Sequence, residues 1–213
     1  MSPYARLEIV LTLLIGAVVT VAVGWLLGWW AVLPGVFALA LLSFYRDPPR
    51  KVPTGEDLLL APADGRVMKI ERDCRAGDGS ELAIVIFLSV LDVHINRSPC
   101  AGSVSAIEYS AGRFLNALRA EATLRNENNV VTIAPHPPLP GPVRVRQIAG
   151  VLARRIVCTL KPGDDVSAGQ RFGMIKLGSQ TEVRVPEDAR WELLVHEGDH
   201  VKAGRTILAR LGQ

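Results

Sequence analysis

The chain has 213 residues, enough for one ordinary domain and an appendage. Its formal net charge of +3, without any basic run, argues against nucleic acid as a partner. Hydrophobic residues make up 49% of the chain, which is high for a soluble protein, and they are unevenly spread. No charged residue occurs between Ile9 and Phe44. The chain therefore divides into an apolar leader and a polar body.

The apolar run Ile9–Phe44 predicts a membrane anchor made of two short helices. A bilayer core needs roughly 20 apolar helical residues, so this run is too long for one span and just long enough for two. Gly24, Gly28 and Pro34 lie near its middle, where a turn is expected. We therefore predict a membrane helical hairpin over residues 1–45.

The charges on either side of the leader predict its orientation. Basic residues flank both ends: Arg6 before it, and Arg46, Arg50 and Lys51 after it. Under the positive-inside rule both ends stay in the cytoplasm, so the body is expected on the cytoplasmic face of the cell membrane. A cleaved signal peptide and a single tilted span, which would place the body outside, are the alternatives. Residues 46–56, rich in proline and charge, are expected to form a stiff linker.

The body, residues 57–213, repeats itself in two places. The segment Gly163–Gly169 returns 35 residues later as Gly198–Gly204, and Pro62–Val67 returns 37 residues later as Pro99–Val104. Self-similarity at a fixed offset is typical of a duplicated structural unit. The Gly-Asp-x-Val-x-x-Gly spacing resembles the turns of lipoyl- and biotinyl-type barrels.

The pattern of short apolar runs predicts a mainly β fold. Leu82–Leu88, Val130–Ile133 and Val143–Ile148 are runs of strand length bounded by turn residues. Helical spacing occurs over Arg113–Arg125. We expect a barrel-sandwich of duplicated half-units with one or two helices, preceded by the membrane helical hairpin. A membrane-anchored lipoyl/biotinyl-like carrier or adaptor barrel without catalysis is the alternative function, although Gly173–Lys176 only faintly matches a carrier's lysine tip.

Four motifs carry a more specific resemblance. Leu177-Gly178-Ser179 resembles the Leu-Gly-Ser-Thr processing site of phosphatidylserine decarboxylases. Ala61–Val67 resembles that family's Asp-bearing block, and Asp92–Pro99 resembles its His-bearing block. Gln147–Gly150 with Ala153–Val157 is similar to a block of the short, prokaryotic, pyruvoyl-dependent members. The four motifs occur in the right order, and the resemblance covers essentially the whole chain.

The resemblance implies decarboxylation of phosphatidylserine to phosphatidylethanolamine with a covalent pyruvoyl cofactor. Removing CO2 from an amino acid leaves electrons on Cα, which a carbonyl cofactor accepts and an ordinary side chain does not. The family makes that cofactor when Ser179 Oγ attacks the Gly178 carbonyl and β-elimination cuts the chain. A large chain 1–178 and a small chain 179–213 are the expected products. Another serine-headed lipid or a soluble substrate remains open as an alternative.

The resemblance also assigns catalytic roles, because a serine hydroxyl needs a base to become a nucleophile. His94 is the candidate base for Ser179, and Asp64 would orient it as in a hydrolase triad. The other histidines are expected to be surface or turn residues. We expect no metal ion. The family's tendency to dimerise leaves a homodimer open.

Arg97 is a departure from the family pattern. Many members have a second histidine here, three residues after the first. An arginine stays protonated, so we expect His94 to serve both self-cleavage and decarboxylation, while Arg97 holds the substrate's carboxylate or phosphate. Phe114 and Asn116 resemble a family stretch near the lipid substrate. The competing hypothesis is that Asp64, or backbone strain before Ser179, drives the cleavage.

Overall fold

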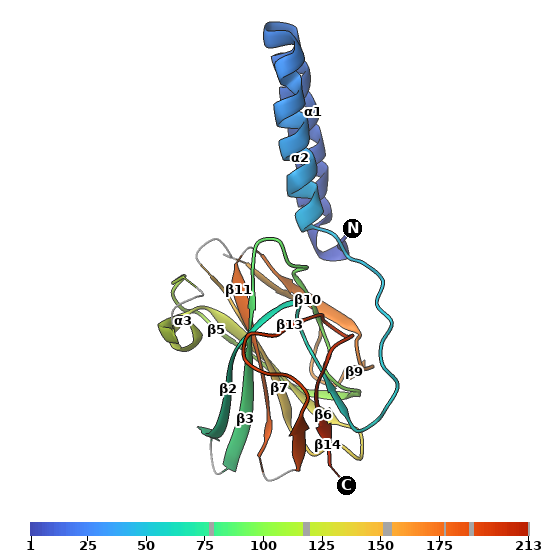
Figure 1. Cartoon of the computed structure of the whole chain (residues 1–213), viewed down its shortest axis with the longest axis vertical. Coiled ribbons are helices and arrows are strands. Elements are labelled where there is room, and N and C mark those ends of the chain that lie inside the picture. The colour runs from blue at the N-terminus through green and yellow to red at the C-terminus, as the bar shows by residue number, and fades with distance from the viewer. Residues whose placement is uncertain (77–78, 117–119, 151–154, 177, 188–189, 213) are drawn as a thin grey trace. The chain divides into compact units, whose positions relative to one another are not determined.

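The computed structural model describes residues 1–76, 79–116, 120–150, 155–176, 178–187 and 190–212. Their contacts divide the chain into two units, Met1–Pro48 and Pro49–Gln213. The first unit is helical and the second is mainly β, as Figure 1 shows. The helical elements of the first unit are η1 (Pro3–Ala5), α1 (Arg6–Leu27), η2 (Gly28–Ala31) and α2 (Val32–Phe44).

In the first unit the chain reverses direction after α1. Gly28 has a φ of 60°, a left-handed conformation that glycine adopts without strain. Further along, α2 packs closely on α1, since a Cβ built on Gly16 would lie 2.7 Å from the Cβ of Ala38. The backbone N–H of Ser2 donates to the carbonyl of Tyr45 over 2.8 Å, which joins the two ends of the segment.

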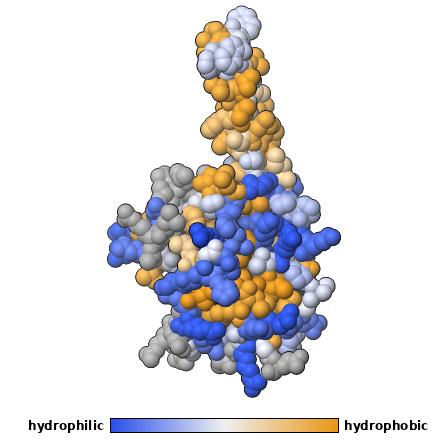
Figure 2. Space-filling view, in the orientation of Figure 1, coloured by the Kyte–Doolittle hydropathy of each residue, from blue (hydrophilic) through white to orange (hydrophobic). Residues whose placement is uncertain are grey.

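The segment Pro3–Phe44 is long and apolar enough to cross a membrane. The face of this segment seen in Figure 2 is mainly orange, the colour of hydrophobic residues, with paler side chains at its tip. The 22 residues of α1 extend about 33 Å, which matches a hydrocarbon core of about 30 Å. The 13 residues of α2 extend only about 20 Å by themselves. The predicted double crossing therefore depends on η2 and the flanking residues as well, and it stays a prediction.

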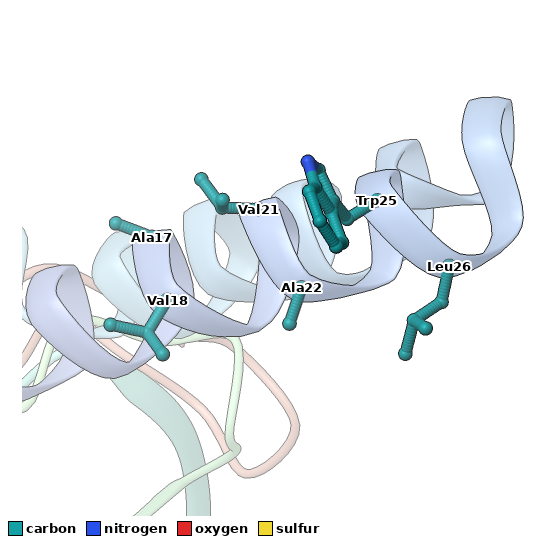
Figure 3. A pocket seen from close by; sticks show the side chains of 6 residues that line it. All are labelled: Ala17, Val18, Val21, Ala22, Trp25 and Leu26. Atoms are coloured by element: carbon teal, nitrogen blue, oxygen red, sulfur yellow. The ribbon is translucent and has the colours of Figure 1, made fainter.

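A shallow depression on α1 is lined by mainly apolar side chains, as Figure 3 shows. It is lined by Ala17, Val18, Val21, Ala22, Trp25 and Leu26. Because none of these side chains is ionisable, the depression suits lipid chains and offers no catalytic group.

The described residues of the second unit form three antiparallel sheets and one short helix. Eight strands form the largest sheet, which is curled (Figure 1) and has the order β13-β2-β3-β11-β7-β6-β5-β9. The two smaller sheets have the orders β1-β14-β12 and β4-β10-β8. The elements are β1 (Leu58–Leu60), β2 (Gly65–Ala76), β3 (Gly79–Leu88), β4 (Ile95–Arg97), β5 (Gly102–Ser110), α3 (Ala120–Arg125), β6 (Asn128–Pro135), β7 (Val143–Ile148), β8 (Ile156–Cys158), β9 (Asp165–Val166), β10 (Arg171–Ile175), β11 (Ser179–Pro186), β12 (Trp191–Leu193), β13 (His200–Val201) and β14 (Ile207–Leu211).

The hydrophobic core lies against one face of the large sheet. Along β3, the alternate residues Leu82, Ile84, Ile86 and Leu88 are all at most 1% exposed and belong to this core. Such alternation arises because successive strand side chains point to opposite faces. The three predicted apolar runs are confirmed as strands, since they lie within β3, β6 and β7.

The predicted helix Arg113–Arg125 is wrong in its first part. The structure places α3 over Ala120–Arg125 only, and residues 117–119 lie outside the described residues. Leu115 donates its backbone N–H to Asn126 Oδ1 over 2.8 Å, and its carbonyl accepts from Asn126 Nδ2 over 2.9 Å. This buried asparagine binds both backbone groups of Leu115, including the carbonyl that a helix would have bonded internally.

The two repeated glycine turns make equivalent hydrogen bonds. Gly163 donates its N–H to the carbonyl of Val104, and Gly198 donates to the carbonyl of Val67, both over 2.8 Å. The strand after each turn also pairs alike, β9 with β5 and β13 with β2. The likeness to lipoyl- and biotinyl-type barrels stays a prediction.

Candidate functional site

Ser179 is the first residue of β11 and is fully buried. It pairs with Leu88, the last residue of β3. The strand's period of two places its side chain on the same face as the core residues Val183 and Val185. Among the described residues, its Oγ has no hydrogen-bond partner. A buried hydroxyl left without a partner costs about 1–3 kcal/mol and marks a position that needs explanation.

Gly178 places the peptide bond before Ser179 in an open turn. Its φ is 63°, and a Cβ built on it would meet nothing within 4 Å. Glycine is therefore required here by backbone conformation and not by crowding. Because glycine adopts this conformation without strain, the geometry gives no support to cleavage driven by strain. Leu177, the first residue of the processing motif, lies outside the described residues.

His94 is fully buried immediately before β4. Its carbonyl accepts from the backbone N–H of Ile175 over 3.2 Å, which ties it to the end of β10. Its Nδ1 lies 2.8 Å from the carbonyl oxygen of Asp92. A carbonyl only accepts, so Nδ1 carries the hydrogen and Nε2 holds the lone pair of the neutral ring. The nitrogen available as a base is therefore Nε2.

A hydrogen bond links the segment that carries His94 to the strand that begins at Ser179. Asn96 Nδ2 donates to Thr181 Oγ1 over 3.1 Å, and both residues are fully buried. His94 lies two residues before Asn96, and Ser179 lies two residues before Thr181. The hydrogen bond therefore joins the segment of His94 to the strand of Ser179, and contact between the base and the nucleophile themselves stays a prediction.

The same hydrogen bond belongs to a buried chain of amides that sequence reasoning missed. Gln147 Nε2 donates to Asn96 Oδ1 over 2.9 Å, and Asn129 Nδ2 donates to Gln147 Oε1 over 3.0 Å. Satisfied buried polar networks hold elements in a unique register. Asn96 and Gln147 lie within the motifs Asp92–Pro99 and Gln147–Gly150. In the sequence, the amide of Asn96 two residues after His94 was the one indication of this network.

Asp64 accepts hydrogen bonds from a backbone N–H and from an arginine, and its predicted pairing with His94 stays a prediction. Its Oδ1 accepts from the backbone N–H of Ala203 over 2.8 Å, and its Oδ2 accepts from Arg50 Nη2 over 2.6 Å. The hydrogen bond from His94 that a triad would contain is not among these. Burial raises the pKa of the Asp64 carboxyl, while the Ala203 N–H and Arg50 lower it and Asp92 raises it. Sequence reasoning took Arg50 for a charge flanking the membrane.

The three predicted substrate-binding residues differ in exposure. Arg97 is 7% exposed, and its Nη1 donates to the carbonyl of Gly169 over 3.0 Å. Its backbone N–H donates to the carbonyl of Pro62 over 2.9 Å. Phe114 and Asn116, in contrast, are exposed on the segment before α3. Arg97 therefore has a structural role that the sequence did not indicate.

The arrangement can support acyl transfer within the chain. A buried hydroxyl follows directly on a glycine carbonyl, and the segment of a buried histidine is hydrogen-bonded to the same strand. These are the parts that an activated serine nucleophile requires. Within the described ranges, no group of three or more His, Cys, Asp or Glu side chains would hold a metal ion.

Comparison with known proteins identifies a single family. The family model described as phosphatidylserine decarboxylase matches residues 37–209. A protein of Rhodopirellula baltica named phosphatidylserine decarboxylase proenzyme is 42% identical over 99% of this chain and 89% of that protein. A protein of the same name from Symbiobacterium thermophilum is 46% identical over 92% of this chain and 89% of its own length.

Proposed function

The chain belongs to the phosphatidylserine decarboxylase family, and we therefore infer that it converts phosphatidylserine to phosphatidylethanolamine and CO2. It is an enzyme, a carboxy-lyase. The observation that carries this conclusion is the similarity, over nearly its full length, to relatives named as proenzymes of that activity. The buried Ser179 behind Gly178 supports the same conclusion, because a proenzyme must be processed before it acts.

Self-cleavage begins at Ser179 in this proposal. Its Oγ gives a proton to His94 Nε2 and attacks the Gly178 carbonyl carbon. The amide bond breaks, an ester forms in its place, and the proton passes to the freed amino group of Ser179. His94 Nε2, which has given up its first proton, takes the Ser179 Cα proton, and this expels the Gly178 carboxylate and leaves dehydroalanine. Water hydrolyses this residue to a pyruvoyl group and ammonia.

The surroundings of Ser179 fit a pyruvoyl group at that position. No described residue bonds the hydroxyl that would be replaced, and the pairing with Leu88 would hold the new end of chain 179–213. Once formed, the group supplies the electron sink for breaking the bond between the substrate's Cα and its carboxylate. His94 holds a proton at Nε2 for return to that carbon, and Arg97 carries the charge suited to an anionic substrate group.

The substrate is tested directly with purified protein. Phosphatidylserine in detergent micelles is expected to release CO2 and give phosphatidylethanolamine, measured by thin-layer chromatography of labelled lipid. Borohydride treatment is expected to abolish the activity, because it reduces a carbonyl. Equal rates on free serine would contradict a lipid substrate. Absence of CO2 from lipid and from serine would favour the carrier or adaptor alternative.

The proposed location is the cell membrane, with the second unit on its cytoplasmic face. This rests on the apolar segment Pro3–Phe44 and on basic residues at both its ends. Single cysteines placed at Ser2 and at Gln213, in a variant without the three native cysteines, are expected to resist an impermeant thiol reagent in intact cells. Labelling at Gln213 alone would indicate a single span and an external body.

Arg50→Ala is expected to move the acid limb of the pH–rate profile of self-cleavage to higher pH. Burial already raises the pKa of Asp64, and Arg50 opposes that rise. Without the guanidinium the pKa rises further, so less of Asp64 is ionised at a given acidic pH and cleavage slows there. Self-cleavage of freshly synthesised chain, followed on gels between pH 5 and 8, measures this.

Two further variants control this prediction. Arg50→Lys keeps the positive charge, so the acid limb of its pH–rate profile is expected to lie close to that of the wild type. Arg72→Ala removes a surface ion pair with Glu187 (Nη1 to Oε1, 3.1 Å), a type worth about 0–1 kcal/mol, and is expected to change nothing. A profile that stays in place in Arg50→Ala would exclude Asp64 ionisation from the cleavage step.

A further inference from the structure

Three surface segments are tied to the start of β11, where Ser179 lies. The turn Ser89–Asp92 directly follows Leu88, which pairs with Ser179. The helix α3 contacts the next residue, since Thr123 Oγ1 donates to Gln180 Oε1 over 2.8 Å. The third segment is the one at Arg155, directly before β8. The Arg155 carbonyl accepts from the backbone N–H of Lys176, two residues before Gly178. These three segments form what we call the β11 rim.

The β11 rim exposes large apolar side chains at its tips. Leu91 is 81% exposed and Val90 is 50% exposed. Leu124 on α3 is 78% exposed, although its neighbour Ala122 is fully buried. Phe114, on the segment leading to α3, is also exposed. Single exposed apolar residues are ordinary, but a group of them around one site marks an interaction surface.

The turn in the β11 rim is rigidly built. Asp92 Oδ2 accepts from both the backbone N–H and the Oγ of Ser89, over 2.8 and 2.7 Å, and the Asp92 N–H donates back to the Ser89 carbonyl over 3.0 Å. The carbonyl of Asp92 also holds Nδ1 of His94. The residue that fixes the ring of the candidate base therefore also closes the turn that carries Val90 and Leu91.

The charges of the β11 rim indicate what covers it. Arg113 and Arg125 are exposed next in sequence to Phe114 and Leu124, Arg155 is exposed on the third segment, and Glu121 is an exposed acid on α3. The backbone N–H of Arg113 donates to the carbonyl of Arg125 over 2.8 Å, so two of these cations are held together. Apolar side chains next to an excess of arginine are typical of surfaces that sit in the interface of anionic bilayers.

We propose that the β11 rim is a membrane-interface surface on which the substrate lipid enters the site, with Leu91 and Leu124 inserted among the acyl chains of an anionic bilayer. This rests on the proposed decarboxylation of phosphatidylserine. The rim admits the lipid at the end of β11 where the reactive group is formed. The Asp92 carbonyl binds Nδ1 of His94, and Asp92 also closes the turn. Insertion of the turn into the bilayer therefore also fixes the position of the candidate base.

Leu91→Asp tests the proposal in the full-length protein. Decarboxylation of long-chain phosphatidylserine in anionic vesicles is expected to fall about tenfold, because a carboxylate at the tip opposes insertion. Decarboxylation of a short-chain phosphatidylserine dissolved as monomers is expected to stay within about twofold of the wild type. Leu124→Asp is expected to behave in the same way. Leu194→Asp is the matched control.

The control leucine lies far from the β11 rim. Leu194 is 43% exposed and follows β12, whose Trp191 Nε1 donates to the carbonyl of Pro186 at the opposite end of β11 from Ser179. Self-cleavage, read on gels, is expected to be complete in every variant and shows that each folds. Equal losses on vesicles and on monomers, or no loss on vesicles, would overturn the proposal. If wild-type protein releases no CO2 from either substrate, the proposed function itself has failed.

Discussion

Ser179→Ala is expected to remain a single chain of about 23.1 kDa without decarboxylase activity. Alanine has no hydroxyl, so neither the ester nor the pyruvoyl group can form. The wild type is expected to give chains 1–178 and 179–213, the second blocked to Edman degradation. Intact-mass spectrometry of purified protein distinguishes the two, and activity should fall to background.

The matched control is another fully buried serine, Ser98, whose Oγ donates to the carbonyl of Cys100 over 2.6 Å. Ser98→Ala removes one buried hydrogen bond, which costs about 0.5–1.5 kcal/mol, and is expected to be cut normally. A wild-type protein that stays uncut while it decarboxylates lipid would refute the proposed cofactor. Cutting of Ser179→Ala would assign the nucleophile to another residue.

His94→Ala is expected to leave the precursor largely uncut, even after long incubation. The Asp92 carbonyl holds Nδ1, so Nε2 is the nitrogen that would take the Ser179 proton, and alanine removes it. A positioned general base contributes about 10²–10⁴-fold to a rate. Gel analysis over days measures the loss. A normally cut but inactive His94→Ala protein would refute the dual role and restrict His94 to decarboxylation.

Arg97→Ala is the contrasting variant and is expected to be cut. Arginine cannot accept a proton at working pH. Because its Nη1 donates to the buried Gly169 carbonyl, its loss is expected to lower the free energy of unfolding by about 1–3 kcal/mol. Lipid binding is also expected to weaken. Urea unfolding and a lipid titration separate these effects, and failure of Arg97→Ala to cleave while folded would place Arg97 in the cleavage step.

Local features could be predicted from the sequence because the causes act within a few residues. The apolar composition of Ile9–Phe44 predicts a membrane segment wherever the body lies. The apolar runs within β3, β6 and β7 predict strands because they contain β-branched residues and are bounded by turn residues. The predicted helix Arg113–Arg125 failed in part because Asn126, outside the predicted range, binds the backbone of Leu115.

The sequence by itself determined the family, the candidate nucleophile and the candidate base, since Gly178-Ser179 and the motif around His94 are contiguous. Only the tertiary structure decided which side chains form hydrogen bonds with the residues of these motifs and their neighbours. Arg50 binds Asp64, and Asn96 binds Thr181 although 85 residues separate them. Such partners depend on how strands align across sheets, and a shift of one residue would turn every side chain to the opposite face. Motif spacing contains no information on that alignment, so the hydrogen bonds around Ser179 emerge only once the sheets have formed.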